Sequence, residues 1–227
     1  MYRGKIDKTW GKYQETSMIN LKHDITIAVS KGRILEEGLI LLKKLEIEIS
    51  EDIKNSRKLI YPTNCEKLKL VIVRASDVPT YVANGAADFG IVGKDTLIEY
   101  GDNNIYVPLD LNISKCRMVL ASLPETKPKS KIRVATKYVQ CANDYFIKKK
   151  QQVDIIKLYG SMELAPILGL ADFIVDLVDS GKTLQENGLV EVDSILEISA
   201  RLITNKASMK TKTVSIENII NGFEDII

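Results

Sequence analysis

The sequence predicts an α/β protein, because short apolar runs alternate with amphipathic segments along most of the chain. The runs at 25–29 and 173–178 are rich in β-branched residues, which is typical of buried strands. The segment 34–45 repeats apolar residues at the spacing of a helix that covers one face of a sheet. Strands that are regularly followed by helices favour mostly parallel sheets, since each helix carries the chain back to begin the next strand.

The first half of the chain contains three strand-and-helix units. The expected strands are 25–29, 68–73 and 89–92, and the expected helices are 34–45, 78–84 and a segment opened by Gly93, Lys94 and Asp95. Ser76 and Asp77 stand directly before the second helix, and both residue types favour the N-cap position. The run at 105–109 leads into the second half.

The second half repeats this rhythm and closes with a helix. The expected strands are 116–121, 132–135, 153–158, 173–178, 190–195 and 198–204. The expected helices are 137–150, 163–168, one that begins within 180–183, and 214–226. No internal repeat stands out in the sequence.

Composition and charge restrict the class of protein and of partner. Hydrophobic residues make up 45% and charged residues 27% of the 227 positions, which is typical of a globular protein with a buried core. Lys and Arg number 32 against 30 Asp and Glu, so the chain lacks the basic excess of nucleic-acid-binding proteins. The longest apolar runs are too short to span a membrane.

The first 23 residues differ in character from the rest. They are polar, contain Trp10 and His23, and lack the apolar core of a secretory signal. We therefore expect residues 1–23 to be an extension outside the core fold, and the protein to be cytoplasmic.

Cysteine and histidine usage excludes several kinds of site. Cys65, Cys116 and Cys141 form no C-x-x-C pair, which argues against zinc and favours reduced, structural thiols. The only histidine is His23, so the body of the chain contains none. Mechanisms that need a Ser-His-Asp or a Cys-His pair are thereby excluded.

The segment 173–184 is the most informative motif, because a buried strand runs into acidic residues and then a Ser-Gly-x-Thr turn. Gly181 lets the backbone approach a ligand closely, and the amides at the following helix start can face a phosphate. Ser180 and Thr183 add hydroxyl donors, while Asp176 or Asp179 can accept hydrogen bonds from a sugar.

The segment 173–184 is also open to other interpretations. The run Gly181-Lys182-Thr183 looks like the end of a Walker A loop, but Asp176 stands where that motif requires its first glycine. A capped helix without any ligand remains open from the local pattern alone. The arrangement also resembles the loop with which phosphoribosyltransferases bind phosphoribosyl diphosphate (PRPP).

Cations and glycines also follow other strands. Lys31 and Arg33 flank Gly32 at the start of the first helix, where two positive charges are unfavourable unless an anion joins them. Arg74 directly follows the second expected strand, and its guanidinium can bind a phosphate through two nitrogens. The remaining candidates for contacts with a nucleotide or its phosphates are Asp77, Gly93, Lys94 and Arg117. A simple turn or a solvated charge is the alternative at each position.

Taken together, these motifs resemble the ATP phosphoribosyltransferase family. The matching stretches run in order from residue 25 to 208, and several long motifs in register are far more specific than one loop. They are ITIAVSKGRILEEGL, VRASDVPTYVANGAADFGIVGKDTL, LDLNISKCRMVLA, RVATKY, IIKLYGSMELAPILGLADFIVDLVDSGKTLQENGLVEV and ISARLITNKAS.

The resemblance implies a two-lobed α/β fold similar to type II periplasmic binding proteins, with the active cleft between the lobes. Residues 24–108 and 206–227 would form lobe one, and 109–205 would form lobe two with the PRPP loop. The chain resembles the short form of the family, which lacks a C-terminal histidine-binding domain. That form implies a homodimer by itself and a hetero-octamer with a regulatory subunit similar to histidyl-tRNA synthetase.

The resemblance also implies the reaction, the first step of histidine biosynthesis. The phosphoribosyl group of PRPP passes to N1 of ATP and diphosphate leaves, with Mg²⁺ carried by the substrate phosphates and no dedicated protein ligands. The implied PRPP-binding residues are Asp176, Asp179, Ser180, Gly181, Lys182, Thr183 and Leu184, with Asp176 and Glu163 as catalytic candidates. A helix cap is the alternative for Glu163. The implied ATP and diphosphate contacts are Lys31, Gly32, Arg33, Arg74, Asp77, Gly93, Lys94 and Arg117.

Two rival functions remain at this point. A two-lobed solute-binding protein would share the fold, although the missing signal peptide and the acidic residues before the Ser-Gly-x-Thr turn disfavour it. A phosphoribosyltransferase with another acceptor base would share the 176–184 loop. A measurement of PRPP binding distinguishes the enzyme from a solute-binding protein. The full set of motifs argues against a phosphoribosyltransferase with another acceptor base.

Overall fold

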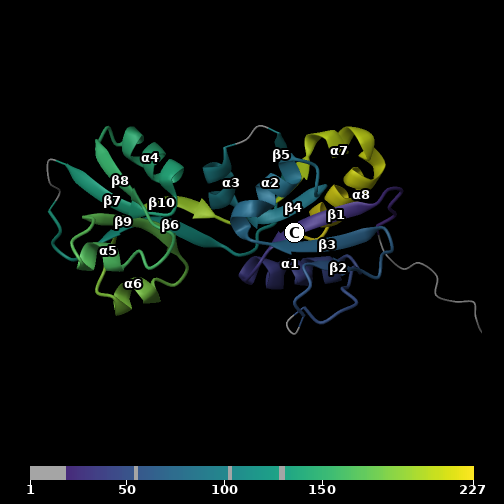
Figure 1. Ribbon diagram of the computed structural model, residues 1–227, viewed down its shortest axis with the longest axis horizontal. Helices are drawn as coiled ribbons and strands as arrows, with labels where there is room; N and C mark the ends of the chain where they lie inside the picture. Colours follow the sequence, from purple (N-terminus) through teal and green to yellow (C-terminus); the bar gives the residue numbers. More distant parts are fainter. Residues whose placement is uncertain (1–18, 54–55, 102–103, 128–130) are drawn as a thin grey trace, which may run out of the picture.

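The computed structural model describes residues 19–53, 56–101, 104–127 and 131–227, and Trp10 lies outside these ranges. The chain forms two lobes that lie side by side along the longest axis, each built on one sheet (Figure 1). The sheet of lobe one has the order β2 (Ile60–Pro62), β3 (Leu68–Val73), β1 (Ile25–Ser30), β4 (Phe89–Gly93), β11 (Ala200–Asn205) and β5 (Ile105–Asp110). The sheet of lobe two has the order β10 (Val190–Ile198), β6 (Cys116–Ser122), β9 (Phe173–Val178), β7 (Ile132–Thr136) and β8 (Val153–Lys157).

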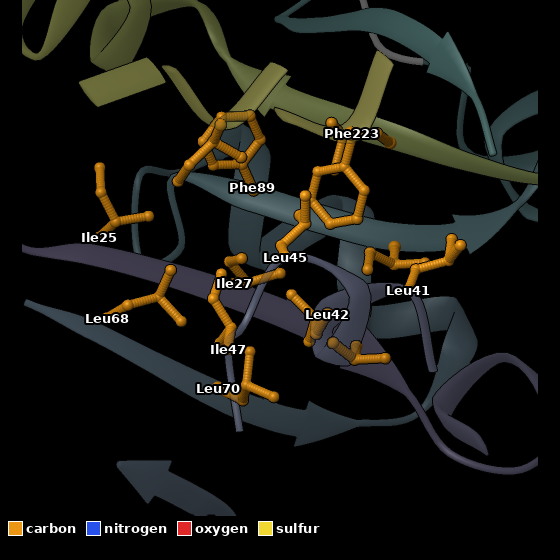
Figure 2. Close-up of a cluster of buried hydrophobic side chains, with 14 of the residues drawn as sticks. Ile25, Ile27, Leu41, Leu42, Leu45, Ile47, Leu68, Leu70, Phe89 and Phe223 are labelled. Atoms are coloured by element: carbon orange, nitrogen blue, oxygen red, sulfur yellow. The ribbon is translucent and has the colours of Figure 1, made fainter. Parts of the chain in front are cut away.

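Helices cover both faces of the sheet in lobe one. The amphipathic helix α1 (Arg33–Lys44) and the C-terminal helix α8 (Thr213–Glu224) pack on the face that carries Ile25 and Ile27. Figure 2 shows Leu42 and Leu45 beside Ile27, with Phe223 close to Leu45, in the same cluster as Ile25 and Leu41. Helix α2 (Val78–Ala83) packs on the opposite face with Ala28 and Val92. The alternation of side chains along β1 decides which residue faces which helix.

Lobe two is layered in the same way. Helix α4 (Val139–Lys148) contributes Phe146 to the core on one face. Helices α5 (Leu164–Ile167) and α6 (Lys182–Glu186) contribute Ala165 and Leu184 to the core on the other face. Helix α3 (Lys94–Tyr100) belongs to lobe one, yet its Ile98 packs against the core of lobe two.

The prediction of mostly parallel sheets is wrong, because both sheets are mixed. In lobe one, β1 runs parallel to β3 and β4, whereas β11 runs antiparallel to β4 and β5. In lobe two, β7 runs parallel to β8 and β9, whereas β6 runs antiparallel to β9 and β10. The antiparallel strands flank the two passages of the chain between the lobes, where no helix returns the chain to its starting edge.

Several expected elements differ in detail. Ser76 and Asp77 lie inside a short 3₁₀ turn at Ala75–Asp77, and neither side chain caps α2, because Arg74 already begins the helical hydrogen bonding. The break between the last two strands falls at Ser199. The closing segment is two helices, α7 (Lys206–Thr211) and α8, and the short edge strand β2 was not predicted.

Two of the predicted domain boundaries also differ from those in the structure. Residues 1–23 were expected to lie outside the core, but Ile19 and Leu21 are buried in the core of lobe one, and residues 1–18 lie outside the described residues. Residues 109–205 were expected to form lobe two, but β11 pairs within the sheet of lobe one. Buried area and strand pairing, which depend on distant segments, therefore set both limits.

The two lobes repeat one structural unit, although no repeat stands out in the sequence. The sheet orders β3-β1-β4 and β8-β7-β9 correspond. In each unit an Asp directly precedes the last strand and accepts a backbone amide of the central strand's start: Asp88 from Thr26 at 3.0 Å, and Asp172 from Arg133 at 2.9 Å. A left-handed glycine stands three residues earlier in both units, Gly85 at φ 73° and Gly169 at φ 71°.

Candidate active site

The two lobes meet at the carboxyl ends of their parallel strands. The ends of β1, β3 and β4 share one edge of the first sheet, and the ends of β7, β8 and β9 share one edge of the second. These edges touch where Nη1 of Arg33, just after β1, lies 2.7 Å from Oδ2 of Asp179, just after β9. Ligands of α/β proteins bind outside such strand ends, so this boundary is the candidate site.

On the side of lobe two, the segment after β9 turns sharply into α6. Gly181 occupies the left-handed region at φ 79°, and the hydroxyl of Ser180 accepts a hydrogen bond from the amide of Lys182 at 3.5 Å. Ser180 and Thr183 are exposed, whereas the side chain of Leu184 is buried in the core. An anion at this turn would therefore meet hydroxyl groups and amides, and Leu184 serves as the anchor of the helix.

Asp176 lies near the end of β9, with Glu163 close enough to influence it. The Oδ1 atom of Asp176 accepts the amide of Leu177 at 2.8 Å. Burial raises the pKa of Asp176, the Leu177 amide lowers it, the charge of Glu163 raises it and the charge of Lys137 lowers it, with a net upward shift. Glu163 makes no side-chain hydrogen bond to the start of α5, so the helix-cap alternative is not realised.

On the side of lobe one, Gly32 and Arg33 shape the start of α1. Gly32 adopts φ 90°, which suits the sharp turn that follows β1. Besides Asp179, the Arg33 guanidinium donates to the carbonyl of Lys115 at 2.9 Å and lies 3.7 Å from Glu37. Lys31 is exposed and forms no ion pair with another described residue. Arg33 thus contacts both lobes, while the Lys31 charge is available to an anion.

The strands β3 and β4 bring further predicted residues to the same edge. Arg74 is exposed at the end of β3, and Asp77 accepts a hydrogen bond from Ser76 at 3.0 Å. Lys94 donates through its amide to the carbonyl of Ser199 at 3.1 Å, next to the passage between the lobes. At Gly93 a Cβ atom would lie 2.2 Å from Oδ1 of Asp95, so this glycine makes room for the Asp95 carboxylate.

Arg117 lies on β6 opposite Val178, at the same edge, but its guanidinium is engaged within lobe two. Its Nη1 atom lies 2.6 Å from Oε1 of Glu191. Lys182 likewise lies 3.6 Å from Glu186, one turn along α6. Both cations must exchange a carboxylate partner for phosphate if they bind substrate.

Sequence reasoning missed three residues at this boundary: Asp95, Glu99 and Lys137. Asp95 is buried, and burial raises its pKa although hydrogen bonds from Thr96 and the Lys137 charge oppose the shift. Glu99 of α3 accepts the amides of Gln140 and Cys141 at 3.1 and 2.9 Å, which joins lobe one to the start of α4. The stretch RVATKY, in which a lysine directly follows a strand, was the available signal for Lys137.

A surface pocket of about 470 Å³ opens beside Lys31, on the side of lobe one. Arg57 and Lys58 also line it, together with apolar residues that include Tyr61 and Ile72. Lys58 pairs with Glu51 at 2.8 Å. Lys31 and Arg57 thus line one pocket beside the start of α1.

Neither a metal cluster nor a membrane span is found among the residues that the structure describes. No group of three or more His, Cys, Asp or Glu side chains there has the arrangement of a metal site. No helix in the described ranges is long and apolar enough to cross a membrane.

A family model, related sequences and a solved structure all point to the same protein family. The family model "HisG: ATP phosphoribosyltransferase" matches residues 74–225. An ATP phosphoribosyltransferase of Burkholderia cenocepacia is 53% identical over 207 residues, covering 88% of this chain and 95% of that protein. The ATP phosphoribosyl transferase (HisG:HisZ) complex from Thermotoga maritima contains a similar chain, with 33% identity and a TM-score of 0.77 over 88% of this chain and 97% of that one.

More distant structures share only the fold. A putative L-cystine ABC transporter protein from Listeria monocytogenes has a TM-score of 0.55 at 12% identity, covering 89% of this chain and 91% of that one. The expected likeness to periplasmic binding proteins is thus confirmed for the architecture. The family match and the 53% identity decide the identity, and the chain belongs to the ATP phosphoribosyltransferase family, whose members are enzymes.

Proposed function

We propose that the chain transfers the 5-phosphoribosyl group of PRPP to N1 of ATP, which forms N1-(5-phosphoribosyl)-ATP and diphosphate. The main support for this proposal is the contact between the candidate binding segments of the two lobes. The 176–184 segment of lobe two stands directly against the cationic start of α1 in lobe one, with Arg33 and Asp179 in contact at 2.7 Å. A sugar-binding acid, a phosphate-binding turn and cations for a diphosphate thus share one boundary.

PRPP binds, in this proposal, at the turn after β9. The amides and hydroxyls of residues 180–183 receive its 5-phosphate, and the conformation of Gly181 supports this by leaving the backbone open to a ligand. Asp176 accepts hydrogen bonds from the ribose hydroxyls, and Glu163 assists beside it. Asp179 stands at the same turn, and a ligand that enters there must separate it from Arg33.

The cations of both lobes bind the remaining phosphates. Lys31, Arg33, Arg74, Lys94 and Arg117 bind diphosphate and triphosphate oxygens, with Gly32, Gly93 and Asp77 shaping their turns. The leaving diphosphate gains negative charge while the ribose gains positive charge, so positioned charges account for most of the catalysis. Mg²⁺ enters with the substrate phosphates, whose oxygen atoms are the kind of ligand this ion prefers.

The chain works, in this proposal, as the short form, with a regulatory subunit that resembles histidyl-tRNA synthetase. The complex from Thermotoga maritima contains HisG together with HisZ, and the similarity to that HisG chain supports the assignment. A homodimer of this chain alone and a hetero-octamer with the partner are the expected assemblies. Histidine is then expected to inhibit through the partner.

The direct test mixes the purified chain with ATP, PRPP, Mg²⁺ and pyrophosphatase, with and without the regulatory subunit, and follows phosphoribosyl-ATP. We expect product that rises with the partner and falls when histidine is added. A folded chain that forms no product in either mixture and does not bind PRPP would instead support a solute-binding function.

The substitution Asp176→Asn tests the assignment of the site. It removes a charged hydrogen-bond acceptor worth about 1.5–3 kcal/mol, so kcat/KM for PRPP should fall roughly 10- to 100-fold. Asp225→Asn, an exposed acid after α8, is the matched control and should behave as the wild type. Unchanged kinetics of Asp176→Asn at limiting PRPP would contradict the role of Asp176.

A further inference from the structure

Lys137 directly follows β7, the central strand of the parallel unit in lobe two. Thr136 pairs with Val175 of β9 on one side and with Lys157 of β8 on the other. Lys137 therefore stands level with Asp176, the next residue of β9. Its ammonium is exposed and forms no ion pair with another described residue, although it lies 5.7 Å from the centre of the Tyr138 ring.

Hydrogen bonds on both sides fix the backbone around Lys137. The Thr136 hydroxyl donates to the carbonyl of Val175 at 2.7 Å and accepts the amide of Tyr138 at 2.9 Å, which ties this turn to the strand of Asp176. On the other side, Glu99 of α3 accepts the amides of Gln140 and Cys141. The turn that carries Lys137 is thus pinned to lobe two and to lobe one at once.

Two carboxylates, the partly buried Asp176 and the buried Asp95, lie within electrostatic reach of this ammonium group. Asp176 comes from lobe two, and Asp95, one helical turn before Glu99, comes from lobe one. The positive charge of Lys137 lowers the pKa of both, against the effect of burial, which raises both. A cation that forms no ion pair of its own and acts on two carboxylates shielded from water favours the charged form of both.

Asp176 must keep its negative charge to accept hydrogen bonds from the ribose hydroxyls as proposed. Its Oδ1 atom is already engaged by the Leu177 amide, so Oδ2 is the oxygen left for the sugar. Protonation would turn an acceptor into a donor and weaken a contact to ribose hydroxyls. Among the neighbouring groups, Glu163 at α5 is acidic, Tyr138 is neutral, and the charge of Arg117, which lies opposite Val178 on β6, is compensated by Glu191.

We propose that Lys137 is a positioning residue for the reaction, whose ammonium group keeps the Asp176 carboxylate in its charged, hydrogen-bond-accepting form. The proposal rests on the proposed role of Asp176 in binding ribose.

The test measures PRPP affinity by calorimetry, in the presence of Mg²⁺ and with the regulatory subunit bound, from pH 5 to pH 9. Lys137→Met removes the charge and keeps an apolar stem of similar length, while Lys137→Arg keeps the charge. Lys148→Met is the matched control, since Lys148 is exposed at the opposite end of α4. The ratio of two proteins' affinities cancels the titration of the PRPP phosphates.

The expected result is a shift of the acid limb of binding. Lys137→Met should lose affinity at a higher pH than the wild type, by roughly fivefold on that limb, and recover at high pH. Lys137→Arg and Lys148→Met should follow the wild-type profile. In an Asp176→Asn background, Lys137→Met should cause no further change, because the carboxylate that it supports is gone.

Two results would overturn the proposal. One is a wild-type acid limb for Lys137→Met, with Lys137→Gln as a second variant if the first does not fold. The other is an equal loss at every pH that persists in the Asp176→Asn background, which would make Lys137 a direct phosphate contact. The failure of the proposed function is separate, since it would appear as unchanged PRPP affinity in Asp176→Asn alone.

Discussion

Asp95 is an acid whose environment opposes its charge. It is 7% exposed, it lies in the first turn of α3, and its Oδ2 atom accepts a hydrogen bond from the Thr96 hydroxyl at 3.3 Å. No lysine or arginine pairs with it among the described residues. Burial raises its pKa above the ordinary value of 3.8, so the folded protein holds the proton more tightly than the unfolded chain does. Stability is therefore lost as the pH rises from 3.8 through the folded pKa.

We predict that Asp95→Asn stabilises the protein at pH 7. The amide keeps an oxygen for the backbone hydrogen bonds and removes the cost of a buried charge. The Tm should rise by about 2–4 °C, the shift that ~1 kcal/mol produces in a protein of this size. The advantage should shrink as the pH falls toward 3.8, and thermal unfolding followed by circular dichroism between pH 5 and pH 8 measures it.

Asp110 provides a control of opposite sign. Partial burial raises the pKa of Asp110. The Asn112 amide, the Ser199 hydroxyl and the charges of Arg201 and Lys115 lower it, and the net shift is downward. Asp110→Asn should therefore lower the Tm at pH 7, by about 2 °C after allowance for its solvent exposure. A lower Tm for Asp95→Asn at pH 7 would show that its carboxylate is stabilised by a contact other than those described.

At the scale of elements, the turns that start helices decide where ligands can approach. Gly181 begins α6 at φ 79°, and Gly188, shortly after the same helix, adopts φ 72°. Neither glycine would bring a new Cβ within 3.4 Å of its surroundings. The two positions therefore carry similar backbone strain when substituted, and differ in that only Gly181 lies in the proposed PRPP loop.

We predict that Gly181→Ala and Gly188→Ala lose similar stability but differ in PRPP binding. An alanine in the left-handed region costs roughly 1–2 kcal/mol, so thermal unfolding should show similar losses in both variants. PRPP affinity should fall in Gly181→Ala by roughly fivefold or more, because relaxation of the turn moves its amides. Equal PRPP affinity in the two variants would place the 5-phosphate elsewhere.

For the whole molecule, the important feature is how the two lobes are joined. Near the chain passages, Asp110 accepts the Ser199 hydroxyl at 3.0 Å and pairs with Arg201 at 2.6 Å. Across the boundary, Arg33 meets Asp179 at one point and Glu99 meets the start of α4 at another. The first contact joins two exposed side chains, whereas the second satisfies two backbone amides that otherwise lack a helical partner.

We predict that Glu99→Ala weakens the union of the lobes. The loss of a carboxylate at a helix start costs about 1 kcal/mol, so the Tm should fall by about 2–4 °C. Hydrogen exchange should accelerate at the amides of Gln140 and Cys141, which Glu99 accepts. Glu66→Ala, at an exposed turn of lobe one, is the control. Unchanged exchange at the two amides would mean that this contact does not hold the lobes.

Local sequence pattern determined the nature of the elements and the position of most strands. The expected strands at 68–73 and 173–178 coincide with β3 and β9, because a β-branched run bounded by turn residues is itself the physical cause of a buried strand. The Ser-Gly-x-Thr turn was visible for the same reason, since φ 79° at Gly181 needs a residue without a Cβ. Motif resemblance then supplied the family.

Tertiary structure alone decided how distant segments meet. Periodicity records that a residue is buried but does not name its partner, so the antiparallel pairing of β11 and the burial of Ile19 were invisible. The structural repeat of the lobes was hidden because its shared features are hydrogen-bond geometry and backbone angles, carried by only a few matching residues. Arg33 and Asp179 are 146 positions apart, and the charge of Lys137 acts on acids of both lobes. Their proximity follows from sheet order and from the two chain passages, which no local pattern specifies.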